Sequence, residues 1–235
     1  MEQVFKRLFM VLDILLAMSG IVLRRMTFAR GLSIALSLGL YFWAMHHASR
    51  TVAIWYFAWA TLFHYVVLFG FFAHGGWSSW FIKRYGEEQG FRRCEAIVAL
   101  VFFHNGASTA LACTSSSGAL HSVLPDYILA VLGIICISIG LTVKVWATAV
   151  VGIDVYYYRD LFVRRPLGIF HTSGPYTIFR NPMYGIGHLH GYGSALLAAS
   201  DMGLTMVAIN QALVWLFYWT VEKPHIKRIF GEKRQ

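Results

Sequence analysis

Charged residues are scarce in this chain. Asp, Glu, Lys and Arg make up 13% of its 235 residues, whereas hydrophobic residues make up 57%. This charged fraction is about half that of an ordinary soluble domain. The composition therefore argues against a soluble fold and indicates a polytopic membrane protein.

Cysteine is scarce as well. The three cysteines, Cys94, Cys113 and Cys136, are widely spaced and lie in apolar runs. Their odd number and spacing argue against a disulfide framework and against a Cys-based metal site. We interpret them as small core residues and expect no metal.

A cleavable leader is a third feature that the sequence lacks. No short apolar segment with a small-residue cleavage site follows Met1, so we expect the first helix to stay in the mature protein. Residues 4–23 form an apolar stretch interrupted by Lys6, Arg7 and Asp13. This stretch is compatible with a spanning helix and with a helix that lies in the membrane interface.

Long apolar runs are what the sequence does contain. A spanning helix needs about 20 mainly apolar residues. Six segments meet or approach that length: 31–49, 52–73, 94–113, 127–150, 184–199 and 204–221. Because only turn residues around Asp201 to Leu204 separate the last two, we expect them to form a tight antiparallel hairpin. We predict an all-α fold, a polytopic helical bundle that forms a single domain over residues 1–235 and ends in this hairpin.

Basic residues set the orientation of the predicted bundle. The net charge of +9 could indicate nucleic acid, but the basic residues flank apolar segments, so we expect anionic lipid headgroups instead. Sixteen of the 20 Lys and Arg fall in residues 24–30, 74–93 and 151–183 and in the tail from Glu222, whereas the opposite loops hold only Arg50. The positive-inside rule then places these four segments in the cytosol.

Polar groups occur where the fourth and fifth predicted spans meet the cytosolic side. Lys144 lies about 10 Å inside the fourth span, where it could snorkel to the surface or face a site. The residues from Lys144 to Phe162 include three Tyr and two Asp, and we expect them at the membrane surface. In the fifth span, helical spacing would place His188 on one face with Tyr184, Gly187, Gly191 and Tyr192. That face is either a small-residue packing seam or the wall of a cavity for a flat polar ligand.

The last predicted helix brings a carboxylate to the same level. Tyr218, Glu222 and His225 would share a face, and Pro224 predicts a disruption just after the acid. The hairpin would place Glu222 level with Tyr184. A carboxylate opposite a polar, glycine-rich pocket suits a cationic ligand.

Two histidines fall near the middles of the second and third predicted spans. His64 and His104 have similar expected depth, and histidines inside a membrane are candidate functional residues. Such a pair could ligate haem. Because Asn105 and the neighbouring helices offer ordinary partners, we favour structural hydrogen bonding.

Three ordered motifs carry a resemblance to a known family. They are GPYTIFRNPMY (174–184), GYGSALLAAS (191–200) and VEKPHIKRIFG (221–231). Over residues 138–231 the chain resembles the membrane methyltransferases that include phosphatidylethanolamine N-methyltransferases and isoprenylcysteine carboxyl methyltransferases, and it is more similar to the first group. Residues 30–137 hold spans without a matching motif.

The resemblance implies a reaction and a location. It implies S-adenosylmethionine bound near the cytosolic face between the last helices, and methyl transfer to the amine of phosphatidylethanolamine and its mono- and dimethyl forms. The membrane would be the endoplasmic reticulum in a eukaryote and the inner membrane in a bacterium. The alternatives are an enzyme like the isoprenylcysteine carboxyl methyltransferases and a non-catalytic haem protein. The sequence does not indicate an oligomeric state.

The resemblance also implies site residues. By position, the cofactor site takes Arg180, Asn181, Pro182, Tyr184, Gly185, Gly187 and Glu222. We add Gly140, Lys144, Tyr176, His188 and His225 as further cofactor-binding candidates. Two departures stand out, since Lys223 replaces a second acid found in shorter family members, and their Gly-x-Gly motif is reduced to Ser138-Ile139-Gly140.

Methyl transfer itself sets chemical requirements. The reaction is an in-line displacement at a sulfonium, so positioning supplies most of the catalysis. An acceptor amine with a pKa near 10 is neutral in only about one part in a thousand at pH 7, so a proton acceptor is useful. The candidate catalytic residues are Asp160, His188 and His190 for the proton and Tyr184 for orienting the sulfonium. Arg159, Arg164 and Arg165 are candidates for the lipid phosphate.

Overall fold

The computed structural model describes residues 2–168 and 172–231. The predicted domain bounds at Met1 and Gln235 and the basic residues after Gly231 lie outside the described residues. Every regular element in the described ranges is helical, which confirms the all-α prediction.

Five of the described helices are long and apolar enough to cross a membrane. They are α2 (Phe28–His46), α3 (Arg50–Phe72), α5 (Glu87–Ser115), α6 (Asp126–Val151) and the continuous C-terminal helix Asp201–Phe230. Large apolar side chains on their outer faces are exposed, among them Phe42, Trp55 and Ile134. Exposed apolar faces of this extent match a lipid environment, and the chain is a polytopic membrane bundle.

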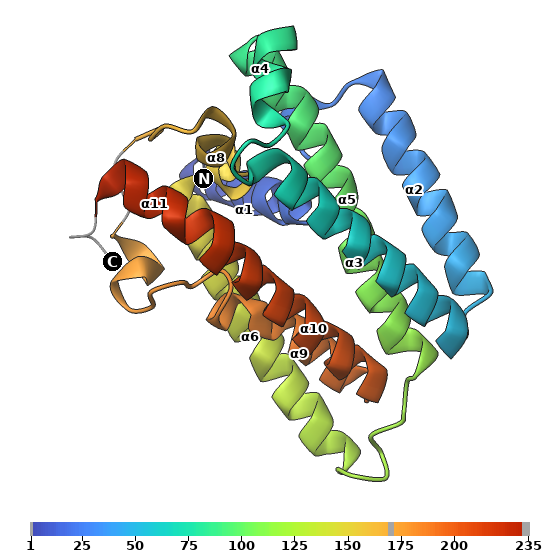
Figure 1. The fold of residues 1–235 in the computed structure, drawn as a ribbon. Coiled ribbons are helices and arrows are strands. Elements are labelled where there is room, and N and C mark those ends of the chain that lie inside the picture. Colours follow the sequence, from blue (N-terminus) through green and yellow to red (C-terminus); the bar gives the residue numbers. More distant parts are fainter. Residues whose placement is uncertain (1, 169–171, 232–235) are drawn as a thin grey trace.

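The two ends of the bundle differ in charge. Figure 1 shows the N-terminus, α4 (Ser78–Tyr85), α8 (Arg159–Val163) and α11 (Lys223–Phe230) together at one end. The turns after α2, α5 and α9 (Leu189–Leu197) lie at the other end. The basic segments therefore gather at one end, the arrangement that the positive-inside pattern predicts.

The first helix lies at this basic end. At 17 residues, α1 (Glu2–Met18) is shorter than the roughly 20 residues of a span. Phe5, Leu8 and Phe9 on its surface are each more than half exposed. The Tyr157 hydroxyl donates a hydrogen bond to the Ala17 carbonyl at 2.5 Å and ties the helix to the bundle. These features favour the interfacial alternative for residues 4–23.

The fifth predicted span, residues 184–199, is wrong as a span. Its α-helix, α9, has nine residues, and a short 3-10 helix, η3 (Ile186–His188), precedes it. Residues 181–185 form turns, so Tyr184 does not share a helical face with Gly191 and Tyr192. Asn-Pro and the closely spaced glycines favour turns over helix here.

The hairpin of α9 with α10 (Asp201–Phe217) is confirmed, but its turn lies earlier than predicted. Ser200 caps α10 by accepting a hydrogen bond from the Gly203 amide at 2.8 Å. Asp201 to Leu204 therefore form the first helical turn instead of a loop.

Glycines let α6 and α9 approach each other closely. A Cβ atom on Gly140 would lie 2.3 Å from the His190 amide nitrogen, and one on Gly193 would lie 2.6 Å from the Gly133 carbonyl oxygen. Of the predicted seam residues, Gly187 lies against Lys144 of α6 and the Pro182 carbonyl, and Gly191 lies against Val207 of α10. The small-residue packing seam is therefore formed by a different set of glycines.

We predict that Gly140→Ala destabilises the protein by about 1–3 kcal/mol, because the α9 backbone must shift to admit the methyl group. The measurement is the thermal unfolding midpoint in detergent. Gly39→Ala in α2 is the matched control, since a Cβ there meets nothing within 4 Å. Equal midpoints for the two variants would contradict the packing role of Gly140.

Candidate active site

A cavity of about 1700 Å³ lies between α5, α6, α9 and the C-terminal helix. Ligand pockets are usually about 300–1,000 Å³, so this one has room for more than one small molecule. Its wall includes nine of the predicted site residues: Lys144, Asp160, Tyr176, Arg180, Asn181, Tyr184, His188, His190 and Glu222. Residues from four separate segments of the sequence thus meet in one space.

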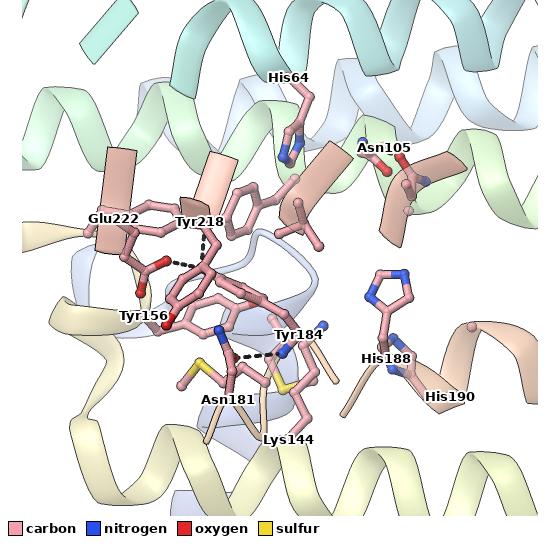
Figure 2. Close-up of a pocket in the computed structure, with 18 of the residues that line it drawn as sticks. His64, Asn105, Lys144, Tyr156, Asn181, Tyr184, His188, His190, Tyr218 and Glu222 are labelled. Carbon is pink, nitrogen blue, oxygen red and sulfur yellow. Dashed lines mark hydrogen bonds between the residues drawn. The ribbon is translucent and has the colours of Figure 1, made fainter. Parts of the chain in front are cut away.

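A carboxylate held by tyrosines lies at the end of the cavity near the basic end of the bundle. The Tyr184 hydroxyl donates a hydrogen bond to Glu222 Oε2 at 2.8 Å, and the Tyr158 and Tyr184 hydroxyl oxygens are 3.1 Å apart. Figure 2 shows Glu222 and Tyr184 meeting across the pocket. The predicted meeting of Glu222 and Tyr184 is confirmed.

The Arg-Asn-Pro-Met-Tyr motif forms a rigid turn that holds Tyr184. The Asn181 side-chain oxygen accepts from the Tyr184 amide at 3.1 Å, and the Pro182 carbonyl accepts from the Gly187 amide at 2.7 Å. The Gln211 side chain in α10 donates to the Tyr184 carbonyl at 3.1 Å. The backbone of the turn is fixed from two sides, so the phenol points at Glu222.

The helix that carries Glu222 changes its winding at this point. Residues Tyr218–Glu222 form a π-helix, η4, directly before Pro224, so the predicted disruption takes the form of a wider turn inside a continuous helix. The rings of Trp215 and Tyr218 lie 6.4 and 6.1 Å from that of Tyr184. An acidic group beside electron-rich rings is an environment that suits a cation.

Asp160 lies in the same wall and comes from α8. Its side chain is 18% exposed, and burial raises the pKa of its carboxyl to about 6. His225 Nε2 lies 3.8 Å from Asp160 Oδ2 but does not line the cavity. A carboxylate with such a pKa accepts a proton efficiently near neutral pH.

Lys144 of α6, His188 of η3 and His190 of α9 lie together in the cavity wall. Figure 2 shows Lys144 extending from α6 toward the turn of Asn181 and Tyr184, with His188 and His190 to one side. His190 Nδ1 lies 2.7 Å from the Gly187 carbonyl oxygen and so carries the proton in the neutral ring. Its Nε2 atom is then a hydrogen-bond acceptor.

Comparisons with known proteins agree with this site. Residues 128–233 match the family model described as phospholipid methyltransferase. Curated relatives named phosphatidylethanolamine N-methyltransferase occur in Kluyveromyces lactis at 32% identity over 100 residues and in Clavispora lusitaniae at 35% over 104 residues. Each match covers 43% of this chain, and the chain spans 12% of the length of each relative. No solved structure matches.

The segment that matches this family model, residues 128–233, makes up less than half of the chain and begins in α6. It contains the cavity wall contributed by α6, α8, α9 and the C-terminal helix. The remaining wall comes from α1, α3 and α5, which lie outside the family match.

Several predicted cofactor residues lie outside the cavity wall. Gly140, Pro182, Gly185, Gly187 and His225 do not line it. Gly140 serves the contact of α6 with α9, and Pro182 and Gly187 shape the turn around Tyr184. Gly140, Pro182 and Gly187 therefore shape the site from outside the cavity wall.

The three arginines predicted to hold the lipid phosphate do not line the cavity either. Arg159 pairs with Asp154 at 2.6 Å and Glu88 at 2.5 Å, Arg165 pairs with Glu87 at 2.6 Å, and Arg164 donates to the Ala73 carbonyl at 3.1 Å. Their guanidinium groups tie α8 to α5 and to the end of α3. These protein partners occupy the three side chains that the sequence predicted to hold the lipid phosphate.

The tyrosines after α6 also differ from expectation. Tyr157 and Tyr158 are buried in the core instead of lying at the membrane surface, and Tyr158 adopts a left-handed backbone with φ of 61°. Asp154 is paired with Arg25 at 2.6 Å. Sequence reasoning missed Tyr158 and Gln211 as site residues, although Gln211 lies seven residues before Tyr218 and thus close to its helical face.

The two intramembrane histidines have ordinary partners. The ring nitrogens of His104 lie 2.7 Å from the Tyr56 hydroxyl and 3.1 Å from the Ser37 hydroxyl. His64 stacks on Phe102 at 5.2 Å. Within residues 2–168 and 172–231, no group of three His, Cys, Asp or Glu could hold a metal ion.

Proposed function

We propose that this chain transfers a methyl group from S-adenosylmethionine to the amine of phosphatidylethanolamine at the cytosolic face of the membrane. The observation that carries the proposal is the Glu222 carboxylate, held by Tyr184 inside a cavity whose wall lies largely in the segment that matches the phospholipid methyltransferase family model. The names of the curated relatives support phosphatidylethanolamine as the acceptor.

The residues present fit S-adenosylmethionine. Its sulfonium is a cation, and Glu222 with the rings of Tyr184 and Tyr218 offers negative charge and aromatic faces. Arg180 lines the exposed end of the cavity, where it would hold the carboxylate of the cofactor. When bound, the cofactor supplies an activated methyl group, and the protein supplies position and charge.

Asp160 is the proton acceptor in this proposal. The lipid amine enters mostly as an ammonium and must lose a proton before it attacks. Asp160 lines the cavity, and its charge acts on Glu222, so it lies near the proposed methyl donor. With a pKa of about 6, it is ionised at neutral pH and can take that proton.

The test is a lipid-product assay with a deuterated methyl donor and mass spectrometry. Purified protein in vesicles of phosphatidylethanolamine should yield lipids heavier by one, two or three labelled methyl groups. A parallel reaction with a farnesyl-cysteine acceptor tests the carboxyl methyltransferase alternative. Labelled farnesyl-cysteine ester without labelled lipid would overturn the proposal.

A further inference from the structure

We propose that Lys144 binds the phosphate of the lipid substrate inside the cavity. It would lie between a groove for the acyl chains and the end of the cavity that holds Glu222 and Asp160, where the amine would meet the methyl donor. The inference rests on the proposed function and adds to it a residue that recognises the substrate class. In this proposal Lys144 contacts the lipid and not the cofactor, and it takes the phosphate-binding role that the sequence predicted for the three arginines.

The wall of the cavity changes in character along the bundle. On α6 the lining residues Ile137, Lys144 and Val151 are seven residues apart, or about 10 Å per step toward the basic end. On the C-terminal helix the lining runs from Val207 toward Glu222 in the same direction. The far part of the wall is mostly apolar, although Asn105, Thr109 and Asn210 also line it. This apolar part, a cation and an acidic end therefore follow one another, as the chains, phosphate and amine do in phosphatidylethanolamine.

The apolar part of the cavity opens at the depth of the hydrocarbon. Gly106, Ala110 and Thr114 on α5 and Leu197 on α9 line the cavity and are exposed at the protein surface. They lie in the middle and far half of the bundle, away from the basic end. A lipid that enters here keeps its chains in the bilayer and directs its headgroup toward the basic end.

No acidic side chain among residues 2–168 and 172–231 forms an ion pair with Lys144. Its side chain makes no hydrogen bond or ion pair with any residue in the described part of the chain. The charge of Lys144 acts on the neighbouring His188 and His190, and these neutral rings supply no negative charge in return. An unpaired ammonium is costly at this depth, so an anionic ligand there would be stabilised strongly.

The other cations in the cavity wall lie closer to its cytosolic mouth. Arg180 is exposed, and Lys223 directly follows Glu222. The phosphate of the lipid lies on the chain side of its amine. Among the described lining residues, only Lys144 therefore places a positive charge between the apolar part and the Glu222 site.

The experiment compares two lipids that differ only in the phosphate. One is phosphatidylethanolamine, and the other is a diacylglycerol that carries a 2-aminoethyl ether, with the same chains and amine. We expect wild-type protein to prefer the phospholipid in kcat/KM, and Lys144→Met to reduce that preference about tenfold or more. Its activity on the phosphate-free lipid and its affinity for S-adenosylmethionine should change less than threefold.

Two variants serve as controls. Lys144→Arg should keep most of the preference for phosphatidylethanolamine, because it keeps the positive charge. Arg165→Met also removes one positive charge, but Arg165 lies outside the cavity wall and its side chain is 58% exposed. This variant should leave the preference for phosphatidylethanolamine unchanged. Equal losses on both lipids in Lys144→Met, or lost cofactor binding, would overturn the phosphate role.

A competition experiment with wild-type protein tests the phosphate site without the use of any variant. Dodecyl phosphate should compete with phosphatidylethanolamine, whereas dodecanol should compete at least tenfold more weakly. Equal inhibition by the two compounds would count against a phosphate site. Failure of wild-type protein to methylate either lipid would overturn the proposed function itself, and the phosphate role with it.

Discussion

Replacing Glu222 with Gln should weaken S-adenosylmethionine binding tenfold or more. The variant keeps the size of the side chain but removes the negative charge that we propose for the sulfonium, while the Tyr184 hydroxyl at 2.8 Å still finds an acceptor. The fold should therefore survive, and the loss should appear in affinity. Isothermal titration calorimetry of the protein in detergent measures the change in Kd.

The matched control for this variant is Glu87→Gln. Glu87 lies at the same end of the bundle, but its carboxylate pairs with Arg165 and does not line the cavity. Its removal should leave the Kd for the cofactor unchanged. If Glu222→Gln bound the cofactor as tightly as wild-type protein, Glu222 would have no part in holding it.

Asp160→Asn should lower kcat by about 10²- to 10⁴-fold, because the amide cannot accept the amine proton. The pH profile gives a second signature. Burial raises the pKa of Asp160 to about 6, so the wild-type carboxyl is ionised above pH 6, and the rate should fall as the pH drops below that value. The variant should lose this part of the profile.

Steady-state rates between pH 5 and 8 test this assignment, with Asp126→Asn as the control. Asp126 lies at the opposite end of the bundle, 80% exposed, and should not affect the rate. If Asp160→Asn kept both the rate and the fall below pH 6, the proton would go to another group. His188 and His190 are then the next candidates, since both line the cavity.

The meeting of Tyr184 and Glu222 was predictable because it follows from hairpin geometry. A polar turn before one helix and an acid at the end of the next must lie at the same level when the two helices are antiparallel. The short length of α9 was not predictable in the same way. The hydropathy of residues 184–199 does not distinguish an α-helix from a 3-10 turn. The backbone hydrogen bonds that decide between them are those that the Asn181 and Pro182 carbonyls accept.

The roles of the arginines show a different limit. Arg159 and Arg165 follow an apolar run, a position that equally suits a phosphate site and a charged flank. Their partners Glu88 and Glu87 are more than 70 residues earlier in the chain, on α5. Such pairings depend on tertiary contacts, which cannot be deduced from the local spacing of residues. The inward position of Tyr157 and Tyr158 depends on tertiary contacts in the same way.

The lateral opening of the cavity between α5 and α9 has a kinetic consequence. A lipid that arrives through it diffuses in two dimensions, so the relevant substrate concentration is its mole fraction in the leaflet. Diluting phosphatidylethanolamine with an inert lipid should lower the rate at constant bulk amount. A monomethylated product would leave into the same leaflet, and its next encounter with the enzyme would depend on surface density instead of vesicle volume.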